Sequence, residues 1–411
     1  MGAPLTPAAA PASEPHRPRW GYQTSLWQVH QPAFWLFMVV LAVSTIFSVI
    51  IQASFADLTP GGWLLSWFLL ALYAVPVVAA VLVLDLYERE PMSLIVAAFL
   101  WGAFAATSMS IFANQGWGLA LIDWFGFDFA GRWAAALTAP FTEEITKGVG
   151  VILIYLIARS EIDDLMDGFV YGAMVGLGFT IVEDVFYFVN VFGGDPGGVL
   201  QGFFVRVIAS GLYGHVLYTG LFGMGVAYFV SRRREATAGK RLGVAVLLTA
   251  AGIFAHFLWN SPLLDFYPTS ELDTAGEYLQ VIFATAVKGL PFLAILALML
   301  VLARRREHRW LRAALATEIG RGGLHPDELA VLESPSARRR SRREMGVRAG
   351  PQAAHVLKRL QKAQINLAMV ATRVHQDDHP DLVRQRQYCQ ALRDWLLAYG
   401  RPRPPAKRPG A

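Results

Sequence analysis

Apolar residues in this chain gather into long unbroken runs instead of alternating with polar ones. A helix that crosses a bilayer needs about 20 mostly apolar residues. Runs of this kind occupy residues 34–51, 63–84, 92–113, 134–158, 166–192, 202–230, 242–260 and 279–303. The pattern therefore predicts an all-α protein, a polytopic bundle of about eight transmembrane helices.

The charges between these runs predict an orientation. Because cations are costly to translocate, Lys and Arg collect in the cytoplasmic loops of membrane proteins. If the N-terminus is cytoplasmic, Arg132 is the only basic residue in an external loop. The others are Arg17, Arg19, Arg89, Arg159, the cluster 232–241 and the flank 304–312. We therefore expect both termini in the cytoplasm and a multi-pass protein of the plasma membrane.

The chain changes character on either side of the apolar part. Residues 1–33 are rich in Pro and Ala and predict a disordered cytoplasmic leader. Residues 34–303 form the predicted transmembrane domain. Residues 304–411 predict a basic cytoplasmic tail, with apolar residues at helical spacing in 356–370 and 388–397. The aromatic stretch 115–131 predicts an interfacial segment, and the arginine-rich run 334–348 a solvated linker that contacts anionic lipid.

Composition agrees with a location in lipid, since 55% of residues are hydrophobic and 16% are charged. A formal charge of +5 would suit nucleic acid, but the basic residues lie beside apolar runs. Membrane lipids are therefore expected partners and nucleic acid is not. The single cysteine, Cys389, excludes a disulfide framework and a cysteine zinc cluster.

Several ionisable residues interrupt the apolar runs. Each costs on the order of 2.5 to 3.5 kcal/mol at the bilayer centre, so each needs a reason to be there. They are Glu143, Glu144 and Lys147 in the fourth run, Glu183 and Asp184 in the fifth, Arg206 and His215 in the sixth, His256 beside Asn260 in the seventh, and Lys288, without an assigned role, in the eighth.

Depth in the bilayer favours a shared site. At about 1.5 Å per residue, Glu143 and Glu183 lie roughly 14 Å below the outer helix ends. His215 lies roughly 20 Å below them and His256 roughly 6 Å. Residues from four helices can therefore meet in the middle to outer half. The opposing interpretation is structural, because Lys147 follows Glu143 by one turn and can simply neutralise it.

The residue types suggest hydrolysis. A buried carboxylate beside a histidine can activate water as a general base, and His256 with the amide of Asn260 would supply donors to an oxyanion. The sequence has no HExxH zinc signature and no evident Ser-His-Asp triad. Buried Glu and His residues also mark proton relays, so a proton-coupled transporter or ion pathway is the alternative function.

Taken as a set, the motifs resemble those of the PrsW family of intramembrane proteases, which is related to the CAAX prenyl proteases and bacteriocin-processing enzymes. The similar segment runs from about residue 85 to residue 260. Its motifs are Asp85-Leu-Tyr-Glu88-Arg-Glu90-Pro91, Glu143-Glu144-x-x-Lys147, Gly178-Phe179 with Glu183-Asp184, then His215, and finally His256-x-x-x-Asn260.

The resemblance implies a peptidase with a glutamate-type mechanism. It assigns Glu143 as general base with Glu144 in support, His215 as the residue that orients water, His256 and Asn260 as oxyanion donors, and Glu183 as a further site residue. No cofactor is certain. A metal-dependent form would place a divalent ion such as zinc among Glu143, Glu183, His215 and His256.

Two departures from the prenyl-protease relatives bear on the substrate. Lys147 replaces an Arg that those relatives carry one position later, and Gly211 replaces an aromatic residue four positions before their His. Prenylated substrates are therefore less expected than a single-span membrane protein. The resemblance implies a membrane-anchored regulatory protein of the anti-sigma type.

Overall fold

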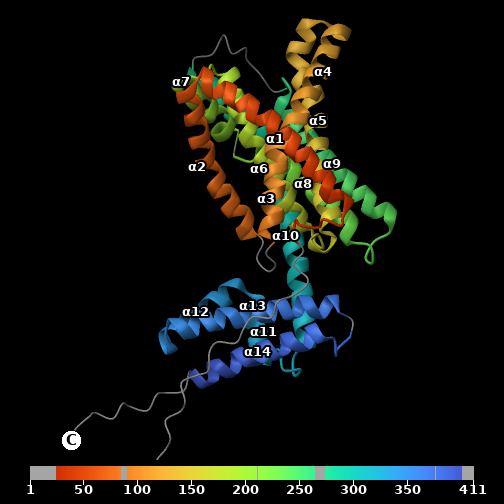
Figure 1. The fold of residues 1–411 in the computed structure, drawn as a ribbon, viewed down its shortest axis with the longest axis vertical. Coiled ribbons are helices and arrows are strands. Elements are labelled where there is room, and N and C mark those ends of the chain that lie inside the picture. Colours follow the sequence, from red (N-terminus) through yellow and green to blue (C-terminus); the bar gives the residue numbers. More distant parts are fainter. Residues whose placement is uncertain (1–24, 85–89, 211, 264–273, 375, 400–411) are drawn as a thin grey trace, which may run out of the picture. The chain divides into compact units, whose positions relative to one another are not determined.

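The structure is a computed structural model that describes residues 25–84, 90–210, 212–263, 274–374 and 376–399. In these ranges all regular elements are helices, apart from one isolated bridge between Ile319 and Leu324 (Figure 1). The predicted all-α fold is confirmed. Most of the predicted leader, the 85–89 part of the early motif and Gly211 lie outside the described residues.

The chain divides into two compact units, one within residues 22–303 and one within 304–411. The first contains α1 (Pro32–Leu58), α2 (Pro60–Leu84), α3 (Met92–Leu100), the π-helix η1 (Trp101–Ala106), α4 (Thr107–Phe125), α5 (Phe127–Ile157), the short 3-10 helix η2 (Arg159–Glu161), α6 (Leu165–Asn190), α7 (Pro196–Phe203), the π-helix η3 (Phe204–Ala209), α8 (Gly214–Ser231) and α9 (Ala238–Asn260). Helix α10 (Thr274–Thr317) begins in this unit and runs past its end.

Six segments of the described chain are long and apolar enough to cross a membrane: α1, α2, the stretch Met92–Phe125, α6, α9 and α10. The pair Pro196–Ala209 and Gly214–Ser231 adds a seventh if it counts as one bent span. The remaining predicted run corresponds to α5, which holds Glu143, Glu144 and Lys147 within its most apolar stretch. All eight predicted runs therefore coincide with helices, and the number that cross the bilayer stays a prediction.

The predicted interfacial segment 115–131 is helical for most of its length. The helix that begins at Met92 continues through η1 and α4 to Phe125, well beyond the predicted end at residue 113. It stops at Gly126, whose φ of 84° lies in the left-handed region that favours glycine. Aromatic content suggested an interface, but no residue before Gly126 breaks the helix.

The predicted sixth span is broken between Ala209 and Gly214, where η3 ends and α8 begins at an angle of 41°. Leu212 in this break has a φ of 64°, and Gly214 has a φ of 29°. Glycine at 211 and 214 weakens a continuous helix by about 1 kcal/mol each relative to alanine. The break places His215 in the first turn of α8.

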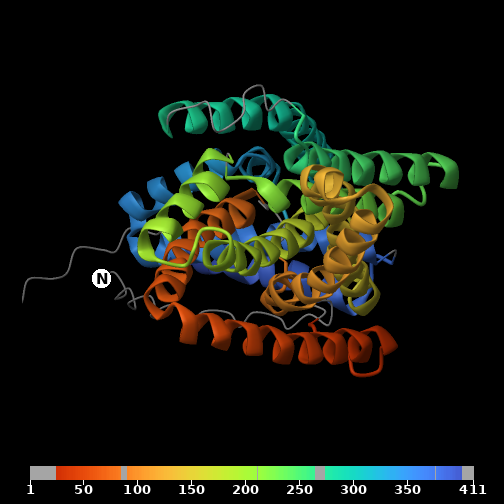
Figure 2. The same cartoon turned by 90° about the horizontal axis from the view of Figure 1, so that it is seen from above.

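Helix α6 lies inside the bundle, and its whole apolar window is buried (Figure 2). Glycines permit this close packing. A Cβ on Gly172 or Gly176 would lie 2.2 Å from the backbone oxygen of Thr219 or His215 in α8. On another face, a Cβ on Gly178 would lie 2.0 Å from a backbone oxygen of α3. These glycines let the backbones approach closely, so α6 is fixed against both neighbours.

The second unit contains α11 (Pro326–Glu333), α12 (Pro335–Ala349), α13 (Pro351–Arg373) and α14 (Pro380–Tyr399). Its core is formed by α13 and α14, and burial there raises the pKa of the Cys389 thiol. The prediction of a linker at 334–348 was wrong, because this stretch is α12. Ser334 caps its first turn, Pro335 occupies the first helical position and Gly350 follows its end.

Candidate active site

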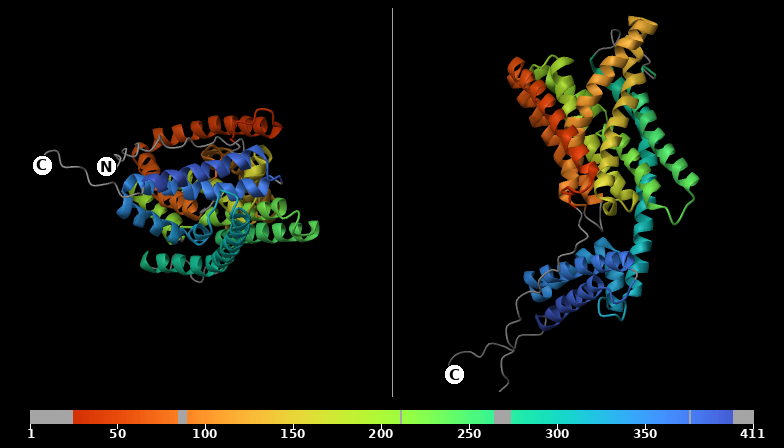
Figure 3. Two further views of the ribbon diagram at one scale, coloured as in Figure 1. Left: turned by 90° about the horizontal axis from the view of Figure 1, so that it is seen from below. Right: turned by 45° about the vertical axis from the view of Figure 1, so that its right-hand side comes forward.

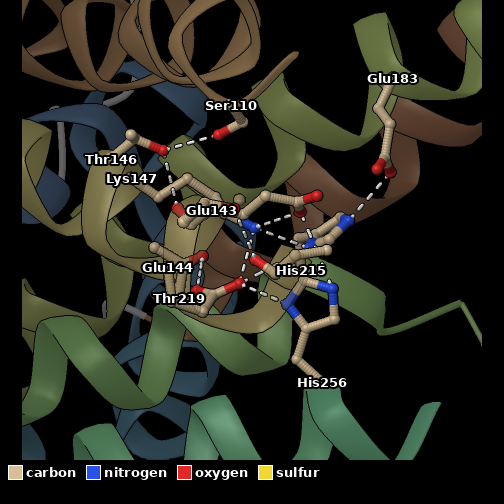
Figure 4. A network of polar contacts seen from close by, with 12 residues as sticks. Ser110, Glu143, Glu144, Thr146, Lys147, Glu183, His215, Thr219 and His256 are labelled. Atoms are coloured by element: carbon tan, nitrogen blue, oxygen red, sulfur yellow. Dashed lines mark hydrogen bonds and ion pairs between the residues drawn. The ribbon is translucent and has the colours of Figure 1, made fainter. Parts of the chain in front are cut away.

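Four helices place the predicted polar residues in one buried network (Figure 4). Helix α5 supplies Glu143 and Glu144, which are 3% and 1% exposed. Helix α8 contributes His215 and α9 contributes His256, whose rings are 4.9 Å apart and nearly perpendicular. Glu183 reaches the same network from α6. The convergence expected from depth alone is therefore present in the structure.

Lys147 occupies the middle of the network and is fully buried. Its Nζ lies 2.6 Å from Oε1 of Glu144 and 3.5 Å from Oε2 of Glu143. It also lies 2.8 Å from Nδ1 of His215 and 4.0 Å from the ring centre of Phe179. One ammonium thus partly neutralises two adjacent carboxylates and donates to a histidine nitrogen, which must be unprotonated to accept.

Each histidine has a carboxylate on one ring nitrogen. Nδ1 of His256 lies 3.1 Å from Oε1 of Glu144, and Nε2 of His215 lies 3.0 Å from Oε2 of Glu183. Carboxylates accept, so these nitrogens carry the protons in the neutral rings. The other nitrogen of each ring is then an acceptor, as in metal-binding histidines oriented by a carboxylate. On His215 this nitrogen already accepts from Lys147, whereas on His256 it faces Oε2 of Glu143.

Glu143 is the least satisfied member. The amide of Asn114 donates to its Oε1 at 3.0 Å. Its Oε2 is buried and has no hydrogen-bond partner among the described residues. This oxygen lies 3.8 Å from Nε2 of His256. A buried carboxylate oxygen without a donor is costly, so a water or a cation is the expected occupant beside it.

Glu183 and Asp184 share one arginine. Arg206 Nη2 lies 2.7 Å from Oε2 of Glu183, and its Nε donates to Oδ1 of Asp184. The guanidinium also covers the ring of Tyr187, 3.7 Å from its centre. Arg206 therefore holds Glu183 in the position where it accepts from His215.

The network fits a divalent cation. One ligand atom from each of Glu143, His215 and His256 lies within 4.8 Å of the others. Three protein ligands of this kind are typical of a catalytic zinc site. With neutral histidines, the network has four carboxylates and only two cations, Lys147 and Arg206. A dication would neutralise this excess of negative charge.

Asn260 as an oxyanion donor and Glu183 as a metal ligand lie differently from expectation. The Asn260 amide donates to the backbone oxygen of Ala135 at 3.3 Å, and no described contact joins it to the network. Glu183 lies behind His215 and is not among the three residues whose ligand atoms converge. It orients His215 instead.

Sequence reasoning missed three residues that hold the site. Thr219 donates to Oε2 of Glu144 at 2.8 Å, and Tyr218 stacks on His256 with ring centres 5.0 Å apart. Asn114 lay between the predicted run that ends at residue 113 and the stretch 115–131 interpreted as interfacial. Thr219 follows His215 by four residues, so its position on the same helix face was the available signal.

A small cavity lies beside His215. Its volume is about 30 Å³, enough for a water molecule. Asp184 lines it, and its buried Oδ2 has no hydrogen-bond partner among the described residues. The cavity is lined by Thr180, Asp184, Arg206, Ser210, Gly214, His215, Tyr218 and Trp259.

Comparison with known proteins agrees with this geometry. Residues 90–290 match the model of the PrsW family intramembrane metalloprotease. The chain is 28% identical over 217 residues to Protease PrsW of Geobacillus kaustophilus (strain HTA426), covering 52% of this chain and 74% of that protein. It is 24% identical over 186 residues to Protease PrsW of Clostridioides difficile (strain 630), covering 44% and 72%.

No solved structure matches the chain. The matched segment contains every carboxylate and histidine of the network, from Glu143 to His256. The resemblance seen in the sequence is thus confirmed: residues 90–290 of this chain are similar to the PrsW family of intramembrane metalloproteases, and both curated relatives are named as proteases of that family.

Proposed function

We propose that the chain is an endopeptidase of the plasma membrane that cleaves a single-span, membrane-anchored regulatory protein of the anti-sigma type. The observation that carries the mechanism is Oε2 of Glu143, which forms an ion pair with Lys147 at 3.5 Å but accepts no hydrogen bond from a described residue, and which is buried 3.8 Å from an acceptor nitrogen of His256. A water placed between these two atoms would donate to both. Glu143 then acts as the general base.

The reaction uses the proton of that water. As the water oxygen attacks the scissile carbonyl carbon, Glu143 takes one proton. It returns the proton to the departing amide nitrogen when the C–N bond breaks, so the carboxylate is regenerated. Glu144 and Glu183 keep the histidines in the required tautomers. Nδ1–H of neutral His256 is directed at Glu144, so His256 is better suited to accept from water or bind a cation than to donate to an oxyanion.

A divalent ion would be held by Glu143, His215 and His256, with the ion taking the place of Lys147 at Nδ1 of His215. Such an ion would polarise the substrate carbonyl and acidify the bound water. Two features support this assignment over a metal-free site. A carboxylate orients each histidine, Glu144 for His256 and Glu183 for His215, and the network carries an excess of negative charge.

Metal content offers a direct test. Purified protein should contain about one zinc or other divalent ion per chain, since three protein ligands define one site. His256→Ala should lower this content strongly, whereas Asn260→Ala should leave it unchanged because Asn260 contacts Ala135 instead. Elemental analysis of both folded variants measures this. Equal metal content in wild type and His256→Ala would exclude the assignment.

The peptidase activity is tested by comparing membrane proteomes of wild-type cells and cells expressing Glu143→Ala. Fragments that end within a predicted transmembrane segment should disappear in the variant, while the variant protein remains in the membrane at the wild-type level. Identical fragment sets in the two strains would contradict the proposal.

The family match favours a protease over the proton-coupled transporter, and no described contact favours the latter.

A further inference from the structure

Helix α10 is attached to the bundle differently from the other helices around the site. Helix α9 approaches α8 through glycine, since a Cβ on Gly252 would lie 2.5 Å from the backbone oxygen of Tyr218. On α10, a Cβ on Gly289 would instead meet the hydroxyl end of the Tyr213 side chain, at 1.6 Å. Its described contacts with the bundle are made through side chains. α10 can therefore separate by side-chain movements alone, whereas α6, α8 and α9 cannot.

The described contacts between α10 and the bundle include two hydrogen bonds and an edge contact between Tyr278 and Phe204, whose ring centres are 4.8 Å apart. The Tyr213 hydroxyl donates to the backbone oxygen of Thr285 at 3.1 Å. The Lys288 ammonium donates to the backbone oxygen of Ser261 at 2.9 Å. Phe292 adds an edge contact to Phe254, with ring centres 6.0 Å apart.

Both hydrogen bonds lie next to the cavity beside His215. Tyr213 directly precedes Gly214, and Ser261 follows Trp259 by two residues. Gly214 and Trp259 line the cavity. The contacts of α10 therefore involve residues next in the chain to the cavity wall. Helix α10 itself runs along the side of the bundle away from α1 (Figures 2 and 3).

We propose that α10 covers the lateral entrance for the substrate, and that the transmembrane segment of a single-span protein reaches Glu143 and the histidines by displacing α10 from Tyr213 and Ser261. The proposal rests on the proposed function and adds the entry route. An apolar, membrane-embedded segment fits this position because it can replace the side-chain contacts that α10 gives up.

The wall of the cavity supplies a group that an unwound substrate would need once α10 has moved, since the closed cavity has room for only about one water. A peptide bond must leave its helix to be attacked, and inside a bilayer its freed N–H and C=O groups need protein partners. The buried, unpartnered Oδ2 of Asp184 offers an acceptor for an N–H. Arg206, which also lines the cavity, holds that carboxylate in place through its other oxygen, Oδ1. The entrance thus leads first to a backbone-binding wall and then to His215.

A reversible bridge between α10 and the start of α8 tests the route. In Tyr213→Cys/Gly289→Cys, the two Cβ atoms are separated by about the length of a tyrosine side chain, which a short bis(methanethiosulfonate) can span. The probe is a tagged single-span Leu/Ala peptide with a central Gly-Pro pair, reconstituted with the full chain in liposomes. Bridging should lower its cleavage about tenfold or more, and reduction should restore it, since entry then limits turnover.

The matched control bridges helices on the opposite side. Ser48 of α1 and Ser108 of α4 have hydroxyl oxygens 3.0 Å apart. Ser48→Cys/Ser108→Cys should keep its own unbridged cleavage rate after disulfide formation. For each cysteine pair the bridged rate is compared with the unbridged rate of the same variant, so any loss of activity caused by the substitutions themselves cancels.

A binding measurement separates the entry route from the chemistry. With Glu143→Gln added and a photo-crosslinking benzoylphenylalanine at position 259, the peptide should form an adduct that the α10 bridge abolishes. An adduct that persists at full yield in the bridged protein would overturn the proposed entrance, whatever the cleavage assay shows. Absence of cleavage by unbridged wild type together with a bridge-sensitive adduct would contradict the proposed function and leave the entrance supported.

Discussion

Glu143→Gln should lower kcat for a membrane-anchored substrate about 10³-fold, because the amide cannot accept a proton from water and general-base catalysis contributes about 10² to 10⁴ in rate. The substitution keeps the shape of the side chain and the bond between Asn114 and Oε1. KM should change little. Cleavage kinetics in liposomes, with metal content measured in parallel, provide the test.

Glu183→Gln is the control for Glu143→Gln, because it makes the same chemical change at a glutamate that does not take the proton from water. It should lower kcat only about 10- to 100-fold, the usual range when a group that orients a ligand or base is removed. Glu183 acts through His215, and Arg206 can still bond the remaining amide oxygen. Equal losses in the two variants would contradict the separate roles assigned to Glu143 and Glu183.

Lys147→Met should destabilise the membrane unit by about 3 to 5 kcal/mol, because removing one partner of a buried ion pair leaves charge uncompensated. The Nζ of Lys147 contacts both Glu143 and Glu144, and methionine nearly fills the same volume over Phe179. The apparent melting temperature in detergent should fall by roughly 10 °C. Intrinsic fluorescence or a thermal aggregation assay measures the shift.

The double variant Lys147→Met/Glu144→Gln should recover much of that loss, since it removes one of the two carboxylates left without a cation. Lys240→Met, at an exposed position of α9, should unfold like wild type. If Lys147→Met itself melted within about 1 °C of wild type, the ammonium would not be compensating the two glutamates.

The helices were predictable because long apolar runs can form little else in a bilayer. Their ends were harder to predict. Nothing in 115–125 stops a helix, and the aromatic content there concealed the continuation to Gly126. The arginine-rich run 334–348 has no apolar stripe to reveal a helix, yet Ser334 and Pro335 form a good N-terminus for one. Capping signals were the more reliable guide at that point.

The sequence predicted which residues form the candidate site better than it predicted the contacts among them. Depth and helix spacing brought together Glu143, Glu144, His215 and His256. They did not reveal that Lys147 lies between two glutamates and a histidine, or that Arg206 from the broken helix holds Glu183. Asn260 shares a helix face with His256, but its amide is directed at Ala135. Spacing on one helix fixes a direction, whereas partners on other helices decide which contact is made.

The complete enclosure of α6 has a consequence for biogenesis. Of the six apolar spans, α6 is the least apolar, and it carries two adjacent acids near its C-terminal end. Alone in lipid it would expose glycines and carboxylates that are stable only against α3, α8 and Arg206. Its neighbours on the C-terminal side are synthesised later. The newly made chain must therefore keep α6 sheltered, by the insertion machinery or by helices already made, until α8 arrives.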